Sequence, residues 1–153
     1  MPTENQHITN RVLLMVDDDE EDVYLIRRAF CAYQTDLVFH SVSDSQNLFD
    51  YLYRRGEYEN RNVIDDPQVI LLDTSTPVEN GLQVLKQLKA DPHYANLPVV
   101  MLSNRNVPED RSKADRLGAA SYITKPVDSD GMQQFAEEFC HFWFGPEKFT
   151  ASG

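Results

Sequence analysis

The sequence predicts an α/β domain built on a five-stranded parallel sheet. Three observations support this prediction: short apolar runs recur along the chain, stretches of helical periodicity separate them, and no repeat or linker interrupts the alternation. With 153 residues the chain can form one compact domain with a full hydrophobic core. Strands and helices that alternate in this way form right-handed crossovers, so we expect the strands to lie in a single sheet.

The expected strands are mainly apolar runs of a length suited to buried strands. They cover residues 12–16, 37–42, 68–72, 97–102 and 120–124. Such runs are typical of parallel strands, because helices cover both faces of a parallel sheet. Between the second and third runs, residues 56–67 show little periodicity, and we expect a surface loop there.

The expected helices follow the strands, at about residues 19–33, 44–55, 82–90, 107–117 and 129–143. The first begins with an acidic turn, which suits the helix dipole, and Gly56 is the stop signal of the second. Pro77 and Gly81 indicate a turn before the third helix. The fourth is strongly polar, whereas the fifth carries an apolar stripe at i, i+3, i+4 and i+7 spacing.

Composition argues against several function classes. A formal net charge of −11 disfavours a nucleic-acid partner, because DNA binding needs a basic face. No apolar run approaches the roughly 20 residues of a membrane helix, and the polar residues 1–10 contain no signal peptide. We therefore expect a cytoplasmic protein without a membrane partner. The two cysteines and four histidines show no metal-ligand spacing.

Carboxylate, hydroxyl or ammonium side chains directly follow four of the five expected strands. Asp17 and Asp18 follow the first strand, Asp73 the third, Ser103 the fourth and Lys125 the fifth. Ligands bind outside the carboxyl ends of the strands in an open parallel sheet, so we expect these side chains to share one site. Each of them alone has a structural explanation, such as a helix cap or a surface lysine, but their joint position does not.

The three carboxylates predict a metal-assisted phosphoryl transfer. They would repel one another without a counter-charge, and Mg²⁺ binds to one or two carboxylates together with waters and substrate oxygens. Lys125 adds a compact positive charge suited to a phosphoryl oxygen. A carboxylate nucleophile beside Mg²⁺ and a lysine can form an acyl phosphate. The remaining acidic residues, 19–22, we interpret as a solvated helix start.

At these positions the sequence resembles the receiver domain of bacterial two-component response regulators. The resemblance rests on LLMVDD at residues 13–18, ILLD at 70–73 with Pro77 and Gly81, Ser103, and YITKP at 122–126. It covers about residues 11–143, and leaves a polar N-terminal segment (1–10) and a C-terminal tail (144–153). It implies a (βα)5 flavodoxin-like three-layer sandwich.

The resemblance also implies a role for each matching residue. Asp73 would be the phospho-acceptor and a ligand of Mg²⁺. Asp18 would bind Mg²⁺ directly, Asp17 mostly through water, and Ser75 through its backbone carbonyl. Lys125 would contact the phosphoryl group.

A switch is implied as well, together with two departures from the family pattern. Ser103 would be the hydroxyl that swings toward the phosphate, and Tyr122 the aromatic side chain coupled to it. Thr-Ser-Thr at residues 74–76 replaces a frequent apolar-Asn-Met triplet whose side chains help to set the lifetime of the aspartyl phosphate. Asn104 stands where Ala or Gly is common, so it can narrow access to Asp73 or add a hydrogen bond to the phosphate.

A narrower similarity is to the small regulators encoded with bacterial phytochromes and related sensor kinases. It rests on DVYLI at residues 22–26, the long loop at 56–67 and FWF at 142–144. The resemblance implies a sensor histidine kinase as partner, with a bacteriophytochrome as one candidate.

The leading interpretation is a stand-alone signalling module that receives a phosphoryl group from this kinase. Because the tail is too short for an output domain, the signal would pass on through protein contacts or dimerisation. An intermediate phosphotransfer carrier or a phosphate sink would use the same chemistry. A phosphohydrolase of the haloacid dehalogenase type is disfavoured, because Ser75 replaces its acid/base aspartate. An inert pseudo-receiver is disfavoured because Asp17, Asp18, Asp73 and Lys125 are all present. We therefore expect no enzyme, only a protein that promotes its own phosphorylation.

The last helix and the tail are rich in aromatic residues, which predicts a homodimer. We expect Phe135, Phe139 and Phe142 to be buried against the sheet, with Trp143 and Phe144 at the edge of that face or beyond it. Exposed aromatic side chains are costly, and a second copy of the chain could cover them. The alternative is that the tail folds back over its own domain.

Overall fold

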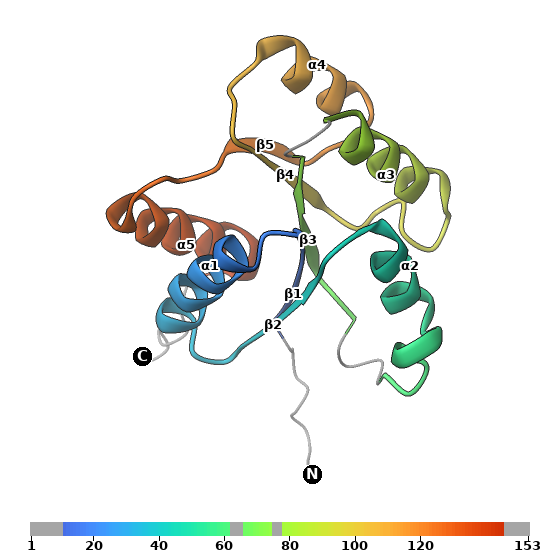
Figure 1. The fold of residues 1–153 in the computed structure, drawn as a ribbon, viewed down its shortest axis with the longest axis horizontal. Coiled ribbons are helices and arrows are strands. Elements are labelled where there is room, and N and C mark those ends of the chain that lie inside the picture. Colours follow the sequence, from blue (N-terminus) through green and yellow to red (C-terminus); the bar gives the residue numbers. More distant parts are fainter. Residues whose placement is uncertain (1–10, 62–65, 75–77, 146–153) are drawn as a thin grey trace.

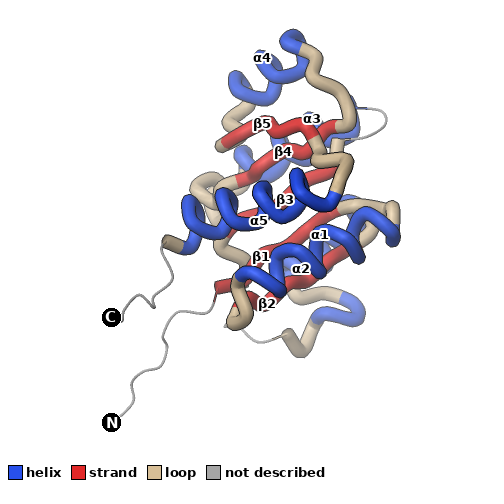
Figure 2. Tube along the Cα trace, turned by 90° about the vertical axis from the view of Figure 1, so that its left-hand side faces the viewer, coloured by secondary structure: helices blue, strands red, loops and turns tan. Residues whose placement is uncertain are grey.

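The computed structural model describes residues 11–61, 66–74 and 78–145. The elements are β1 (Arg11–Val16), α1 (Glu20–Tyr33), β2 (Leu37–Val42), α2 (Ser45–Tyr53), β3 (Val69–Asp73), α3 (Val78–Ala90), β4 (Val99–Ser103), α4 (Pro108–Arg116), β5 (Ser121–Thr124) and α5 (Ser129–Phe144). Helices lie on both faces of one sheet (Figures 1 and 2). The predicted (βα)5 three-layer fold is confirmed. None of the helices in these ranges is long and apolar enough to cross a membrane.

All strand pairs in the sheet are parallel, and the strand order is β2-β1-β3-β4-β5. The register aligns the carboxyl ends of the inner strands, with Val16 opposite Leu72 and Ser103 opposite Thr124. The residues that directly follow β1 and β5 therefore emerge at the same edge as the last residues of β3 and β4.

Alternating strand residues divide the core between the two faces of the sheet. Leu14, Ile70 and Leu72 pack with apolar residues of α2, α3 and α4, whereas Leu13 and Leu71 pack with apolar residues of α1 and α5. Figure 1 shows α1 and α5 on one face of the sheet and α2 and α3 on the other. These strand residues are almost wholly shielded from solvent, as expected for a parallel sheet that is covered on both sides.

Aromatic packing joins α1 to α5 on one face. The ring of Phe30 lies 5.4 Å from that of Phe135 and 5.2 Å from that of Phe139, measured between centroids. Aromatic pairs at such distances contribute about 0.5–1.5 kcal/mol beyond the area they bury. This contact fixes the position of α1, and with it the acidic residues of its first turn.

Most element boundaries differ from the sequence prediction by one or two residues, and those of α2 and α3 have an identifiable local cause. Residue Arg54 adopts a left-handed conformation (φ 55°), so α2 ends at Tyr53, and the expected loop opens with a short 3-10 helix, Gly56–Tyr58. Helix α3 begins before Gly81, which was expected in a turn. A Cβ atom at Gly81 would lie 3.0 Å from Cγ2 of Thr74, so glycine permits close packing of α3 over the end of β3.

The buried face of α5 also differs from the prediction. Phe135 and Phe139 are buried as expected, but Phe142 is 73% exposed and Trp143 packs against the core. Cys140 is buried as well, so the buried face of α5 is centred on a line that passes closer to residue 143 than to residue 142. Residue 142 therefore lies outside the buried face.

Candidate functional site

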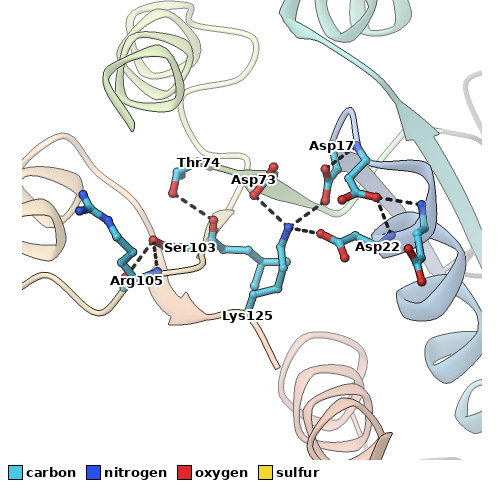
Figure 3. Close-up of polar contacts among 10 residues, drawn as sticks. Asp17, Asp22, Asp73, Thr74, Ser103, Arg105 and Lys125 are labelled. Carbon is cyan, nitrogen blue, oxygen red and sulfur yellow. Dashed lines mark hydrogen bonds and ion pairs between the residues drawn. The ribbon is translucent and has the colours of Figure 1, made fainter. Parts of the chain in front are cut away.

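Of the side chains predicted to share a site, those of Asp17, Asp73 and Lys125 meet at the carboxyl edge of the sheet, whereas the Ser103 hydroxyl is bonded to the backbone of Arg105 (Figure 3). Asp17 follows β1, Asp73 ends β3, Ser103 ends β4 and Lys125 follows β5. Backbone hydrogen bonds extend the pairing past the strand ends, since Asp17 N–H donates to the Val42 carbonyl and Lys125 N–H to the Ser103 carbonyl. The functional side chains are therefore held on backbone that is itself part of the sheet.

Three carboxylates form a compact cluster at this edge. Asp17, Asp18 and Asp73 each place one oxygen so that the three atoms lie within 4.8 Å of one another. The Asp17 and Asp73 side chains are 0% and 5% exposed, whereas Asp18 is exposed. A cleft lined also by Ser43 and Gln83 opens beside them. The oxygen-only donor set and the crowding of like charge fit a hard divalent cation. Ser75, predicted to add a backbone carbonyl, lies outside the described residues.

The ammonium group of Lys125 lies among these acids, and the lysine side chain is 6% exposed. Its Nζ is 3.1 Å from Oδ2 of Asp17, 3.1 Å from Oδ1 of Asp73 and 2.8 Å from Oδ2 of Asp22 (Figure 3). Burial opposes its charge, but the hydrogen bond to Asp22 and the charges of Asp73 and Asp17 outweigh burial and raise the pKa of Lys125. Lys125 therefore stays cationic across the physiological pH range.

Asp22 was wrongly assigned to a solvated helix face. It lies one helical turn before Ile26 and two turns before Phe30, and both of these residues are fully buried. Residues spaced by four lie on the same face of a helix, so Asp22 belongs to the inward stripe of α1. The spacing to these two apolar residues was the signal in the sequence that could have identified it. Asp19, in contrast, caps α1 by accepting hydrogen bonds from the Glu21 and Asp22 N–H groups.

The carboxyl of Asp17 titrates far above its ordinary range. Burial raises the pKa of Asp17 from 3.8 to about 6, and the charge of Asp73 adds to the rise. The Asp19 N–H, 2.9 Å from Asp17 Oδ1, and the Lys125 ammonium act in the opposite direction without cancelling it. One positive charge therefore does not balance this cluster, and a second cation would relieve it.

The two expected switch residues belong to neighbouring strands, because Ser103 ends β4 and Tyr122 lies within β5, three residues before Lys125. The Ser103 hydroxyl donates to the Arg105 carbonyl at 2.8 Å and accepts from the Arg105 N–H at 3.1 Å. Tyr122 is buried, and its hydroxyl has no hydrogen-bond partner among the described residues. The guanidinium of Arg111 lies 5.4 Å from the Tyr122 ring centroid. The two hydrogen bonds with Arg105 therefore attach the Ser103 side chain to the loop before α4.

The two departures from the family pattern take different positions. Thr74 is buried and its hydroxyl donates to the Leu102 carbonyl at 3.0 Å, so this side chain joins β3 to β4. Asn104 is exposed. The remaining two residues of the Thr-Ser-Thr triplet lie outside the described part of the chain.

The family found by comparison with known proteins is consistent with the fold described above. The family model of the response regulator receiver domain matches residues 13–137. The chain belongs to this family. Among curated proteins, the response regulator Rcp1 of Synechocystis sp. is 27% identical over 133 residues, which cover 87% of this chain and 88% of Rcp1. Membership of this family agrees with the five-stranded parallel sheet of the structure.

Solved structures with similar folds include several phytochrome response regulators. A phosphorylated cyanobacterial phytochrome response regulator, RcpA, has a TM-score of 0.78 and 29% identity, and covers 89% of this chain and 95% of its own. The bacteriophytochrome response regulator RtBRR has a TM-score of 0.68 and 33% identity, with 80% and 74% covered. A Mn²⁺-bound form of Rcp1 has a TM-score of 0.75 and 27% identity, with 87% and 94% covered. The predicted similarity to phytochrome-associated regulators is confirmed.

The raised pKa of Asp17 predicts a pH-dependent stability. Between about pH 4 and 6 the folded protein retains a proton that the unfolded chain releases, so stability without metal falls as the pH rises through this window. At pH 7 in EDTA, we expect Asp17→Asn to increase the free energy of unfolding by about 1–2 kcal/mol, and this gain to vanish near pH 4. Urea unfolding followed by circular dichroism measures it. Asp115→Asn, an exposed change on α4, is the control, and a destabilised Asp17→Asn at pH 7 would contradict the prediction.

Proposed function

We propose that this receiver accepts a phosphoryl group from a sensor histidine kinase onto Asp73 and passes the signal on through protein contacts. The observation that carries the proposal is the position of Asp73 Oδ1, 3.1 Å from the Lys125 ammonium within a cluster of three carboxylates. The similarity to phytochrome response regulators supports a phytochrome-type kinase as partner. A cytoplasmic location, as in the receiver family, is part of the proposal. A role as phosphotransfer carrier or phosphate sink would use the same site.

In the proposed reaction a carboxylate oxygen of Asp73 attacks the phosphorus of a phosphohistidine. The new O–P bond forms as the N–P bond breaks, and the electron pair of the broken bond remains on the imidazole nitrogen, which takes up a proton. Lys125, already beside Asp73, offsets charge on a phosphoryl oxygen. The carboxylate is held by β3 at the point of attack, so the protein contributes mainly position and charge, and no turnover of a separate substrate is proposed.

Mg²⁺ is the proposed cofactor, held by Asp17, Asp18, Asp73 and the backbone carbonyl of Ser75. It would draw the phosphoryl oxygens and carboxylates together and offset their charge. Both oxygens of Asp17 already accept hydrogen bonds, one from the Asp19 N–H and one from Lys125, which supports contact through water. Asp18 is exposed at the same edge, which supports direct ligation.

Ser103 and Tyr122 are the proposed switch. To reach a phosphoryl group on Asp73, the Ser103 hydroxyl would exchange its two hydrogen bonds with the Arg105 backbone for one with a phosphoryl oxygen. The buried Tyr122 hydroxyl has no hydrogen-bond partner among the described residues, and the atoms around it would change once Ser103 moved. The loop between β4 and α4 is where the signal would first alter the surface.

The first test replaces the proposed nucleophile. We expect wild type incubated with acetyl phosphate and Mg²⁺ to gain one phosphoryl adduct in intact-mass spectrometry, and Asp73→Asn to gain none, because an amide oxygen is a poor nucleophile. Asp115→Asn serves as the matched control and should be modified like wild type. An equal adduct on Asp73→Asn would show that another residue accepts the phosphoryl group.

The second test separates the metal from the helix cap. We expect Asp18→Ala to weaken Mg²⁺ binding on the order of tenfold, because a carboxylate ligand is lost. Asp19→Ala should leave Mg²⁺ affinity close to wild type but lower the free energy of unfolding by about 1 kcal/mol, because Asp19 caps α1. Isothermal titration and urea unfolding give the two values. Equal Mg²⁺ affinities for the two variants would disprove the proposed metal position.

We also propose a homodimer through α5. Phe142 is 73% exposed and lines a groove with Ile123, Phe135 and Trp143, so an apolar surface is present where a second copy was expected. Of the tail expected to contribute, residues 144–153, the part from 146 to 153 lies outside the described part of the chain.

Sedimentation tests the dimer. We expect wild type to sediment as a dimer at micromolar concentration and Phe142→Ser to weaken association at least tenfold, because a buried aromatic contributes about 2–3 kcal/mol. Tyr24→Ser is the matched control, since Tyr24 is an exposed aromatic on α1. A monomeric wild type, or a Phe142→Ser variant that dimerises equally well, would exclude this interface.

A further inference from the structure

Among the described residues, Asp22 is the acid nearest to the Lys125 ammonium, yet it stands apart from the three-carboxylate cluster. Its Oδ2 lies 2.8 Å from Nζ, against 3.1 Å for each of the other two acids. Unlike them, it comes from a helix, α1, rather than from the end of a strand. Among the described residues, the group of carboxylates close enough to share one metal ion contains Asp17, Asp18 and Asp73 but not Asp22.

The number of donors on the ammonium makes this contact significant. A lysine ammonium carries three N–H donors, and three carboxylates surround this one, at Asp17, Asp22 and Asp73 (Figure 3). In the proposed function, Asp73 becomes an acyl phosphate and Asp17 shares its charge with Mg²⁺. Asp22 is the acid of the three whose role does not change during the reaction.

The place of Asp22 in the fold suits it to hold another side chain in position. It lies on the same stripe of α1 as Ile26 and Phe30, which are fully buried, and Phe30 packs against both Phe135 and Phe139 of α5. Its own N–H is engaged by the cap residue Asp19. The carboxylate is 32% exposed but stands on rigid backbone. Lysine, by contrast, has a flexible four-carbon stem that a single partner would leave mobile.

From this geometry we infer that Asp22 is a positioning residue for the phosphorylation reaction. It binds one N–H of Lys125 while Asp17 binds a second, so that the third is directed at Asp73 before the reaction and at a phosphoryl oxygen after it. This inference rests on the proposed function and adds to it a fourth acid, on α1, that acts on the phosphoryl group through the lysine and not on the metal.

Beryllofluoride with Mg²⁺ is the probe, because it mimics a phosphoryl group on an aspartate without covalent turnover. Its dissociation constant is measured by ¹⁹F NMR at saturating Mg²⁺, and Mg²⁺ affinity alone by isothermal titration. We expect Asp22→Ala to weaken beryllofluoride binding about tenfold, the size expected for one charged hydrogen bond. Asp22→Asn should recover most of this loss, because its amide oxygen still accepts a hydrogen bond from Lys125.

Glu21→Gln is the matched control, since it removes the same charge from the neighbouring, exposed position of α1. It should bind beryllofluoride like wild type, and Mg²⁺ as Asp22→Asn does. In a Lys125→Ala background, Asp22→Ala should cause no further loss, because its effect passes through the lysine.

The results separate the inference from the function on which it rests. Wild type that binds no beryllofluoride would overturn both. Wild type that binds it, with Asp22→Ala binding as tightly or more tightly, would overturn the positioning role alone, and tighter binding would show that Asp22 competes with the phosphoryl group for Lys125. An Asp22→Asn variant as weak as Asp22→Ala, or an additive loss in the Lys125→Ala background, would also contradict it.

Discussion

The buried ammonium of Lys125 is the interaction on which the carboxyl edge of the sheet depends. It joins β5 to β1, α1 and β3 through carboxylates at 2.8–3.1 Å. A buried charge is tolerated only when its neighbours compensate it, and here the carboxylates of Asp17, Asp22 and Asp73 compensate the charge of Lys125. The edge is nevertheless not balanced, because the pKa of Asp17 is raised to about 6. The excess of negative charge makes the site receptive to a cation.

The rest of the fold holds this charged edge rigid. Next to the acidic cluster, the residues that precede the carboxyl end of β1 and β3 are apolar, and the change from apolar to charged residues occurs within one peptide, between Val16 and Asp17 and between Leu72 and Asp73. On one face, the contact of Phe30 with α5 fixes the helix that carries Asp22. On the other, Gly81 lets α3 approach Thr74, which is tied to Leu102. Both faces therefore bear directly on the site.

What could be predicted from the sequence was what short-range patterns determine. The strands, their order along the chain and the chemical residues at their ends follow from apolar runs and from the rule that such ends share one edge. Asp22 was missed because a run of acids hides which member lies on the buried stripe. Phe142 was wrongly predicted to be buried because residues 142 and 143 both lie near the apolar face of α5, and only three-dimensional packing determines which of them is covered. Gly81 was misread as a turn because a glycine required for close packing looks the same in sequence.

The position of Ser103 connects the charged edge to the surface of the molecule. Its carbonyl accepts the Lys125 N–H at 2.7 Å, while its hydroxyl is bonded to the backbone of Arg105. Ser103 therefore forms hydrogen bonds both with Lys125, directly after β5, and with the loop that leads to α4. In the proposed function, a phosphoryl group on Asp73 would offer the hydroxyl a charged acceptor, which forms stronger hydrogen bonds than a backbone carbonyl does. Movement of Ser103 toward it would free the Arg105 backbone without disturbing the β4–β5 pairing, so the surface can change while the sheet stays intact.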